Sequence, residues 1–135
     1  MSAAAFLDTN VIIYAFTDDP RRETAEILLA TGGVISVQVL NEFANAARRK
    51  LGMDWAEVRD ALSAIRTLCP SVIGLDVDVH EKGMALGERY GLSVYDSLIV
   101  AAALQGGCKT LLTEDLQDGL VVERRLTVHN PFRQP

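Results

Sequence analysis

Near its start the chain carries the stretch Ala3-Ala4-Ala5-Phe6-Leu7-Asp8-Thr9-Asn10, in which an unbroken apolar run stops at an acid. A short run of this kind is typical of a strand that is buried on both faces of a parallel sheet. Asp8 would then lie at the carboxyl end of that strand, where open α/β sheets bind their ligands. This stretch therefore predicts a parallel sheet with a polar site at its edge.

Short apolar runs recur along the chain, and helical stretches separate them. This alternation predicts an α/β fold, a three-layer α/β/α sandwich with a largely parallel five-stranded sheet. The first strand is expected at Ala3–Leu7 and the others at Val34–Val37, Val72–Leu75, Thr110–Leu112 and Leu126–His129. Helices are expected from Pro20 with Asp19 as its cap, over Val39–Lys50, Asp54–Leu68 and Val79–Tyr90, and from Ser93 to Gly106.

The composition is that of one ordinary globular domain, spanning residues 1–135, with 49% hydrophobic and 23% charged residues. We expect a cytoplasmic protein, because the N-terminus resembles no signal peptide and no apolar run is long enough to cross a membrane. Cys69 and Cys108 fit neither a disulfide framework nor a zinc spacing, so they are expected to be reduced and buried.

Four acids have positions that suit a shared site. Asp8 ends the first predicted strand, Glu42 lies in the first turns of the helix after the second, and Asp115 follows the fourth. Asp96 opens the last strong helix. Because ligand sites gather at the carboxyl ends of parallel strands, these side chains could meet in one pocket.

Each acid also has a structural explanation. Asp8 could cap the next helix, Glu42 could lie on a solvated helix face beside Gln38, and Asp115 could be a turn residue. Asp96 fits a capping box with Ser93, yet it projects onto the face of an uncharged and therefore buried helix. A carboxylate turned toward an apolar core needs a compensating partner, which favours a functional role for Asp96.

The net charge of −5 argues at first against a nucleic-acid partner, since phosphate binding favours basic residues. That objection weakens if the four acids hold a divalent cation. Mg²⁺ is typically held by a few carboxylates together with water and substrate phosphate. The sequence shows no nucleophile elbow, phosphate-binding glycine loop or zinc motif that would support another hydrolytic chemistry.

Four segments resemble, in order and spacing, the acidic motifs of PIN-domain ribonucleases, and most closely those of the VapC-type toxins of toxin–antitoxin pairs. The segments are Phe6–Asn10, Ser36–Phe43, Tyr95–Ala102 and Leu111–Asp115. The resemblance covers almost the whole chain. It implies a PIN-like sandwich, one or two Mg²⁺ or Mn²⁺ ions, and endonucleolytic hydrolysis of RNA. It also implies a homodimer and a cognate antitoxin whose C-terminal segment covers the acidic pocket.

Carried over by position, Asp8 and Asp96 match the principal metal ligands, Glu42 the acid of the second motif, and Asp115 the acid of the fourth. Glu114 and Asp118 compete with Asp115 for the last role. Thr9, Asn10 and Thr113 match positions that orient the carboxylates or a water molecule. Among the basic residues, Arg48, Arg49 and Lys50 are candidates for RNA binding, although cations also suit the end of a helix.

Two other functions stay open. The chain could be another Mg²⁺-dependent phosphoesterase. A haloacid-type phosphatase, however, would want an acid where Asn10 stands, and a receiver module would want a lysine after a late strand, whereas Lys109 precedes one. It could instead be a non-catalytic PIN-like interaction module, against which the complete set of four acids speaks.

Overall fold

The computed structural model describes residues 4–133, and its centre is a six-stranded sheet in the order β3-β2-β1-β4-β6-β5. All neighbouring strands run parallel except β5 and β6, which are antiparallel. The strands are β1 (Phe6–Leu7), β2 (Val34–Ser36), β3 (Ser71–Ile73), β4 (Thr110–Leu112), β5 (Val121–Val122) and β6 (Leu126–His129). The predicted largely parallel α/β fold is therefore confirmed.

The expected number of five strands was wrong. β5 pairs with β6 as a short antiparallel hairpin, with Val121 opposite Thr127 and Val122 opposite Leu126. Two residues are too few to produce a recognisable periodicity, so only the pairing reveals this strand. The first strand is also shorter than expected, because β1 comprises Phe6 and Leu7 alone. Ala3, where it was expected to begin, lies outside the described residues.

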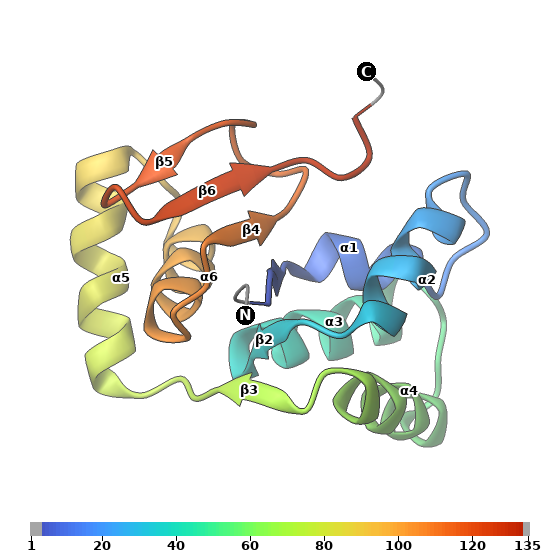
Figure 1. Ribbon diagram of the computed structural model, residues 1–135. Coiled ribbons are helices and arrows are strands. Elements are labelled where there is room, and N and C mark those ends of the chain that lie inside the picture. Colours follow the sequence, from blue (N-terminus) through green and yellow to red (C-terminus); the bar gives the residue numbers. More distant parts are fainter. Residues whose placement is uncertain (1–3, 134–135) are drawn as a thin grey trace.

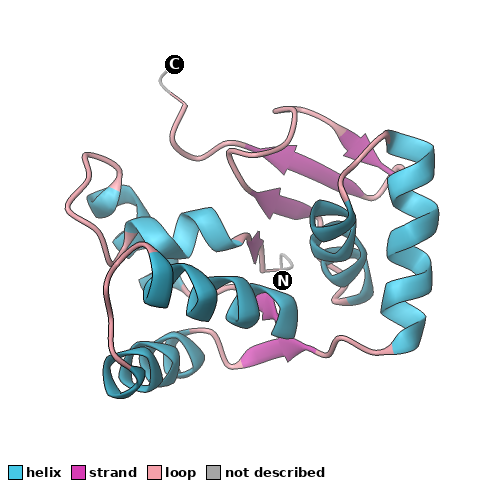
Figure 2. Ribbon diagram, turned by 180° about the vertical axis from the view of Figure 1, so that it is seen from behind, coloured by secondary structure: helices cyan, strands magenta, loops and turns pink. Residues whose placement is uncertain are grey.

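Six helices are described within residues 4–133: α1 (Thr9–Tyr14), α2 (Arg22–Thr31), α3 (Val37–Arg49), α4 (Trp55–Leu68), α5 (Val77–Tyr90) and α6 (Val94–Gln105). In Figures 1 and 2, α5 stands at one end of the molecule, and α2 and α4 lie at the other. No helix in the described part of the chain is long and apolar enough to cross a membrane.

Local capping explains where several helices begin. Asp54 and Glu57 form the expected capping box of α4, and Ser36 ends β2 and caps α3 by accepting from the Val39 amide. The expectation for the second helix was wrong in detail. Asp19 accepts from the Arg21 amide in a turn, and α2 starts only at Arg22. Pro20 therefore lies before this helix rather than in its first turn.

Helix α6 is the buried element that the sequence predicted, since every side chain from Ser97 to Ala103 is buried. It packs against β2, β3 and β4, and most extensively against α5. Close approach of α5 is possible because Gly83 and Gly87 face it: a Cβ at Gly87 would lie 2.5 Å from Ser97 Oγ. This packing holds the start of α6, and with it Asp96, in position.

Candidate metal centre

Asp8 is the most buried of the four predicted acids, with 3% of its surface exposed. It is the N-cap of α1, so the capping explanation describes part of its role: Oδ1 accepts from the Thr9 amide at 2.7 Å. Oδ2 accepts from the Thr113 hydroxyl at 2.8 Å and from the Asn10 amide group at 3.4 Å. The carboxylate is thus fully oriented by neutral donors.

Burial raises the pKa of Asp8 from 3.8 to about 7. The hydrogen bonds from Thr113 and Thr9 lower the pKa and so oppose this shift, whereas the charges of Glu42 and Asp115 add to it. Within residues 4–133, no arginine, lysine or histidine forms an ion pair with Asp8. A buried acid with two acidic neighbours and no cation is electrostatically incomplete.

Glu42 comes from α3 and is held beside Asp8 through Thr9. The Thr9 hydroxyl donates to Glu42 Oε1 at 2.9 Å, and the Gln38 amide group donates to Oε2, also at 2.9 Å. Gln38 itself is 7% exposed. Glu42 is therefore half-buried rather than fully solvated. The buried side of α3 comprises Gln38, Val39, Phe43, Ala46 and Ala47, which places Glu42 at the edge of the site.

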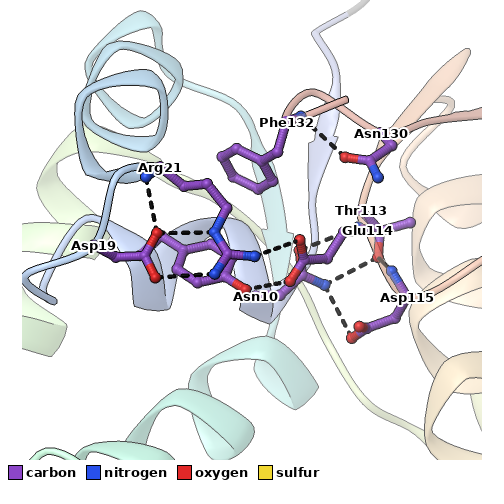
Figure 3. A network of polar contacts seen from close by, with 9 residues as sticks. Asn10, Asp19, Arg21, Thr113, Glu114, Asp115, Asn130 and Phe132 are labelled. Carbon is purple, nitrogen blue, oxygen red and sulfur yellow. Dashed lines mark hydrogen bonds and ion pairs between the residues drawn. The ribbon is translucent and has the colours of Figure 1, made fainter. Parts of the chain in front are cut away.

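Asn10 and Thr113 join the acids of the first and fourth motifs. The Asn10 amide group donates to Thr113 Oγ1 at 3.0 Å and to Asp115 Oδ2 at 3.1 Å (Figure 3). Thr113 Oγ1 also accepts from the Asp115 backbone amide at 3.0 Å. The Thr113 hydroxyl also donates a hydrogen bond to Asp8. The Thr113 side chain therefore links Asp8 to the backbone of Asp115.

Asp96 is the third residue of α6, where Ser93 caps the helix by accepting from the Asp96 amide at 3.2 Å. The side chain is half-buried rather than turned fully into the core. Burial raises its pKa, the Ser93 hydroxyl lowers it, and the charge of Asp115 raises it further. Asp96 and Asp115 are therefore electrostatic neighbours, as Asp8 is of Glu42 and Asp115.

The neighbouring acids differ in what they bind. Glu114 accepts from the Tyr14 hydroxyl and forms an ion pair with Arg21 at 3.3 Å. Asp118 pairs with Arg133 at 3.1 Å and accepts from the Asn130 amide at 2.9 Å. Figure 3 shows Glu114 directed toward Arg21 and Asp115 toward Asn10. Of the three candidates for the fourth acid, Asp115 is the one whose carboxylate is tied to the Asp8 network through Asn10, whereas Glu114 contacts Asn10 only through its backbone amide.

Glu42 and Asp115 line an open groove, whereas Asp8 and Asp96 do not line it, so the four carboxylates do not close on one point. In the part of the chain that the structure describes, no three His, Cys, Asp or Glu side chains lie close enough to hold one ion together. The chemistry of the donors nevertheless fits a hard divalent cation, which binds carboxylate and neutral oxygens. The buried charge of Asp8, with no protein cation beside it, is the feature that such an ion would complete.

A groove of about 740 Å³ leads from these acids along α3. Glu42 and Asp115 line its acidic end, and Arg49 and Lys50 line the other. Arg48 is held elsewhere, since it donates to the Met53 carbonyl at 3.0 Å and stacks on Trp55. Two of the three basic residues singled out from the sequence thus face the groove.

Comparison with known proteins agrees with this architecture. The chain is similar to three solved structures, at identities that establish the fold alone. A toxin–antitoxin complex from Klebsiella pneumoniae is 22% identical, with a TM-score of 0.73, over 97% of this chain and 100% of that one. Mycobacterium tuberculosis VapC20, described as a sarcin–ricin loop cleaving toxin, is 23% identical, with a TM-score of 0.64, over 80% and 87%. VapBC2 from Rickettsia felis, bound to a DNA fragment from its promoter, is 20% identical, with a TM-score of 0.64, over 93% and 97%.

No curated protein sequence matches the chain. The family model described as PIN domain matches residues 5–117, which include all four acids. The resemblance inferred from the acidic motifs is therefore confirmed at the level of the family. The chain belongs to the PIN-domain family.

Proposed function

We propose that this protein is a divalent-metal-dependent endoribonuclease that serves as the toxin of a toxin–antitoxin pair. The structure of Asp8 carries the proposal. Its carboxylate is 3% exposed and is oriented by three donors, but no cation in the described part of the chain compensates its charge. A buried charge without such a partner does not stabilise the fold. Its cost is understandable if the missing partner is a metal ion that binds together with the substrate.

Asp8 and Asp96 would hold the ion as principal ligands, with Glu42 and Asp115 as the further acids. Oxygen donors of this kind suit Mg²⁺ or Mn²⁺. When bound, such an ion lowers the pKa of a bound water molecule and compensates the charge of the phosphodiester that is cleaved. The same ion would neutralise the acidic end of the groove, so that an anionic substrate can approach it.

The remaining polar residues orient these groups. Thr113 and Asn10 fix Asp8 and Asp115 relative to one another, and Thr9 and Gln38 fix Glu42. Mutation of residues that orient metal ligands in this way typically lowers metal affinity or activity by about 10- to 100-fold. Arg49 and Lys50 lie where they can bind phosphates of an RNA strand.

The proposed partners are RNA as substrate, a cognate antitoxin, and a second copy of the chain in a homodimer. The antitoxin is suggested by the neighbours described as toxin–antitoxin and VapBC structures. Trp55 adds an observation from this chain. Its side chain is 60% exposed rather than packed into its own core, so the α3–α4 junction presents an aromatic surface of the kind that interfaces use.

Cleavage of single-stranded and structured RNA by the purified protein tests the proposal. We expect products with Mg²⁺ or Mn²⁺, none with EDTA, and none from Asp96→Asn. Asp118→Asn is the matched control, because Asp118 is an aspartate paired with Arg133 outside the site. Cleavage that persists in EDTA, or that survives in Asp96→Asn, would contradict metal-dependent hydrolysis at this site. Absence of cleavage by the wild type under every metal condition would instead favour a non-catalytic PIN-like module.

A further inference from the structure

A second hollow, of about 410 Å³, adjoins the acidic groove at the other side of Glu42. Its lining is Gln38, Asn41, Glu42, Asn45 and Tyr95. Glu42 and Asn45 line both spaces, so the two hollows adjoin each other along α3. The volume falls within the roughly 300–1,000 Å³ range of small-ligand sites. We call this hollow the amide pocket.

The charge of the amide pocket differs from that of the groove. The groove contains Arg49 and Lys50, whereas the amide pocket is lined by no cation and by one carboxylate. A phosphate is therefore disfavoured in the amide pocket, and an uncharged, flat and polar group is favoured. Its donors and acceptors are side-chain amides, which match the edges of nucleobases.

Tyr95 gives the amide pocket an aromatic wall. Its ring is 64% exposed, and Trp55 is the other exposed aromatic residue in the described part of the chain. Tyr95 directly precedes Asp96 in α6, so the ring stands next to a predicted metal ligand. Aromatic side chains beside amide groups are how proteins bind unstacked bases of single-stranded RNA.

The free amides of α3 complete the recognition surface. Asn41 and Asn45 are four residues apart, so they project from the same face of α3 on successive turns. Within residues 4–133, neither side-chain amide has a hydrogen-bond partner, whereas Gln38 is occupied with Glu42. Both asparagines can therefore donate to, and accept from, a ligand without losing a contact of the fold.

Resting on the proposed ribonuclease function, the geometry points to the amide pocket as a nucleobase subsite for single-stranded RNA. The base stacks on Tyr95, and Asn41 and Asn45 contact its edge. From Asn41 to Arg49 the rise of α3 is about 12 Å, so the amide pocket and the basic residues are separated along the helix. One strand can thus place a base in the amide pocket, its scissile phosphate at the acids, and a later phosphate at Arg49 and Lys50.

The test is binding of fluorescein-labelled RNA 12-mers of A, C, G and U, measured by fluorescence anisotropy with Mg²⁺ in an Asp96→Asn background, in which we expect no cleavage. We expect Tyr95→Ala to weaken binding about 5- to 150-fold, as expected for one lost stacking contact, and Tyr95→Phe to bind like wild type. Val77→Ala is the control, since Val77 is 71% exposed but lies outside both hollows. Equal affinities of Tyr95→Ala and Val77→Ala would overturn the subsite.

Two further results sharpen the test. Asn41→Ala/Asn45→Ala should bind the four RNAs with more similar affinities than wild type, and unchanged discrimination would overturn edge recognition by these amides. If Tyr95→Ala changes the sedimentation coefficient but not RNA affinity, the ring belongs to a protein interface, and the subsite is wrong. Cleavage is scored separately: Tyr95-dependent binding without metal-dependent cleavage by wild type would refute the proposed activity while the base subsite stands.

Discussion

In two acidic regions of this protein, the surroundings shift the pKa of an aspartate in opposite directions. At the C-terminal end, Asp118 is surrounded by donors and cations: the Asn130 amide, Arg133 and His129 all lower its pKa. In the candidate metal centre, burial raises the pKa of Asp8 to about 7, and its charged neighbours are acids. The acid near the C-terminus has protein partners for its charge. The acid in the centre has orientation without charge compensation, which is the arrangement expected of a cation-binding site.

The largest expected effect on this contrast is that of Asp96→Asn. With Mg²⁺ or Mn²⁺, RNA cleavage should fall by more than about 100-fold, since even residues that only orient ligands contribute 10–100-fold. The melting temperature in EDTA should stay equal or rise, because removing one of several neighbouring anions relieves repulsion with Asp115. Cleavage assays and thermal unfolding check this. A lower melting temperature with normal turnover would mean that Asp96 serves the helix start alone.

The second effect concerns the pH dependence of stability in EDTA. The folded state raises the pKa of Asp8 above its ordinary value of 3.8, so it favours the protonated acid. The contribution of Asp8 to the free energy of unfolding is fully present below about pH 4 and is lost as the pH rises through about 7. This loss is on the order of a few kcal/mol. Urea unfolding across this range measures it.

Asp8→Asn should remove that slope, and Mg²⁺ should restore stability most at pH 8 in wild type. Asp118 provides the comparison of opposite sign. Because its pKa is lowered, its contribution is present above its ordinary pKa and is lost as the pH falls. Asp118→Asn should therefore leave the slope between pH 4 and 7 intact. An identical slope in wild type and Asp8→Asn would show that Asp8 does not cause it.

The third effect tests whether orientation matters apart from charge. Thr113→Val removes the hydroxyl that donates to Asp8 and accepts from Asn10 and the Asp115 amide, while preserving the shape of the side chain. We expect about 10–100-fold slower cleavage. Thr113→Ser keeps the hydroxyl and should retain most of the activity. Kinetics over a range of Mg²⁺ concentrations distinguish weaker metal binding from a slower reaction, and equal rates for Val and Ser would contradict the orienting role.

The fourth effect concerns the packing of α5 against α6, the helix that carries Asp96. In Gly87→Ala the new methyl group would lie 2.5 Å from Ser97 Oγ, so either the Ser97 hydroxyl must turn away from the Ser93 carbonyl or α5 and α6 must move apart. We expect a loss of about 1–3 kcal/mol in the free energy of unfolding, because the contact becomes overpacked. Gly74→Ala is the control, since a Cβ there meets nothing within 4 Å. Urea unfolding of both variants decides; equal stabilities would mean that the helix contact adapts freely.

The smallest expected effect is that of Asp118→Asn at neutral pH. Its ion pair is with the largely exposed Arg133, and exposed pairs of this kind contribute little to stability. RNA cleavage should be unchanged. A marked loss of cleavage would show that Asp118 contributes to the site of Asp8 and that the two acidic regions are not separate.

Local patterns explain how much could be predicted. The strands β1, β2 and β4, the buried α6 and the capping box of α4 follow from short-range periodicity and capping residues, and all were expected in nearly their observed positions. The strand β5 was not predicted, because two residues give too little periodicity. The helix α1 was anticipated only as a helix that Asp8 could cap, and its six residues show too little periodicity to give its bounds.

The sequence by itself determined which acids follow which strands, because an apolar run ending at an acid is a local signal. Tertiary structure alone decided which of Glu114, Asp115 and Asp118 faces Asp8. That choice depends on contacts between residues far apart in the chain, such as Asn10 with Asp115 and Arg21 with Glu114. It also decided the raised pKa of Asp8, since desolvation arises only when the sheet and its helices close around the carboxylate.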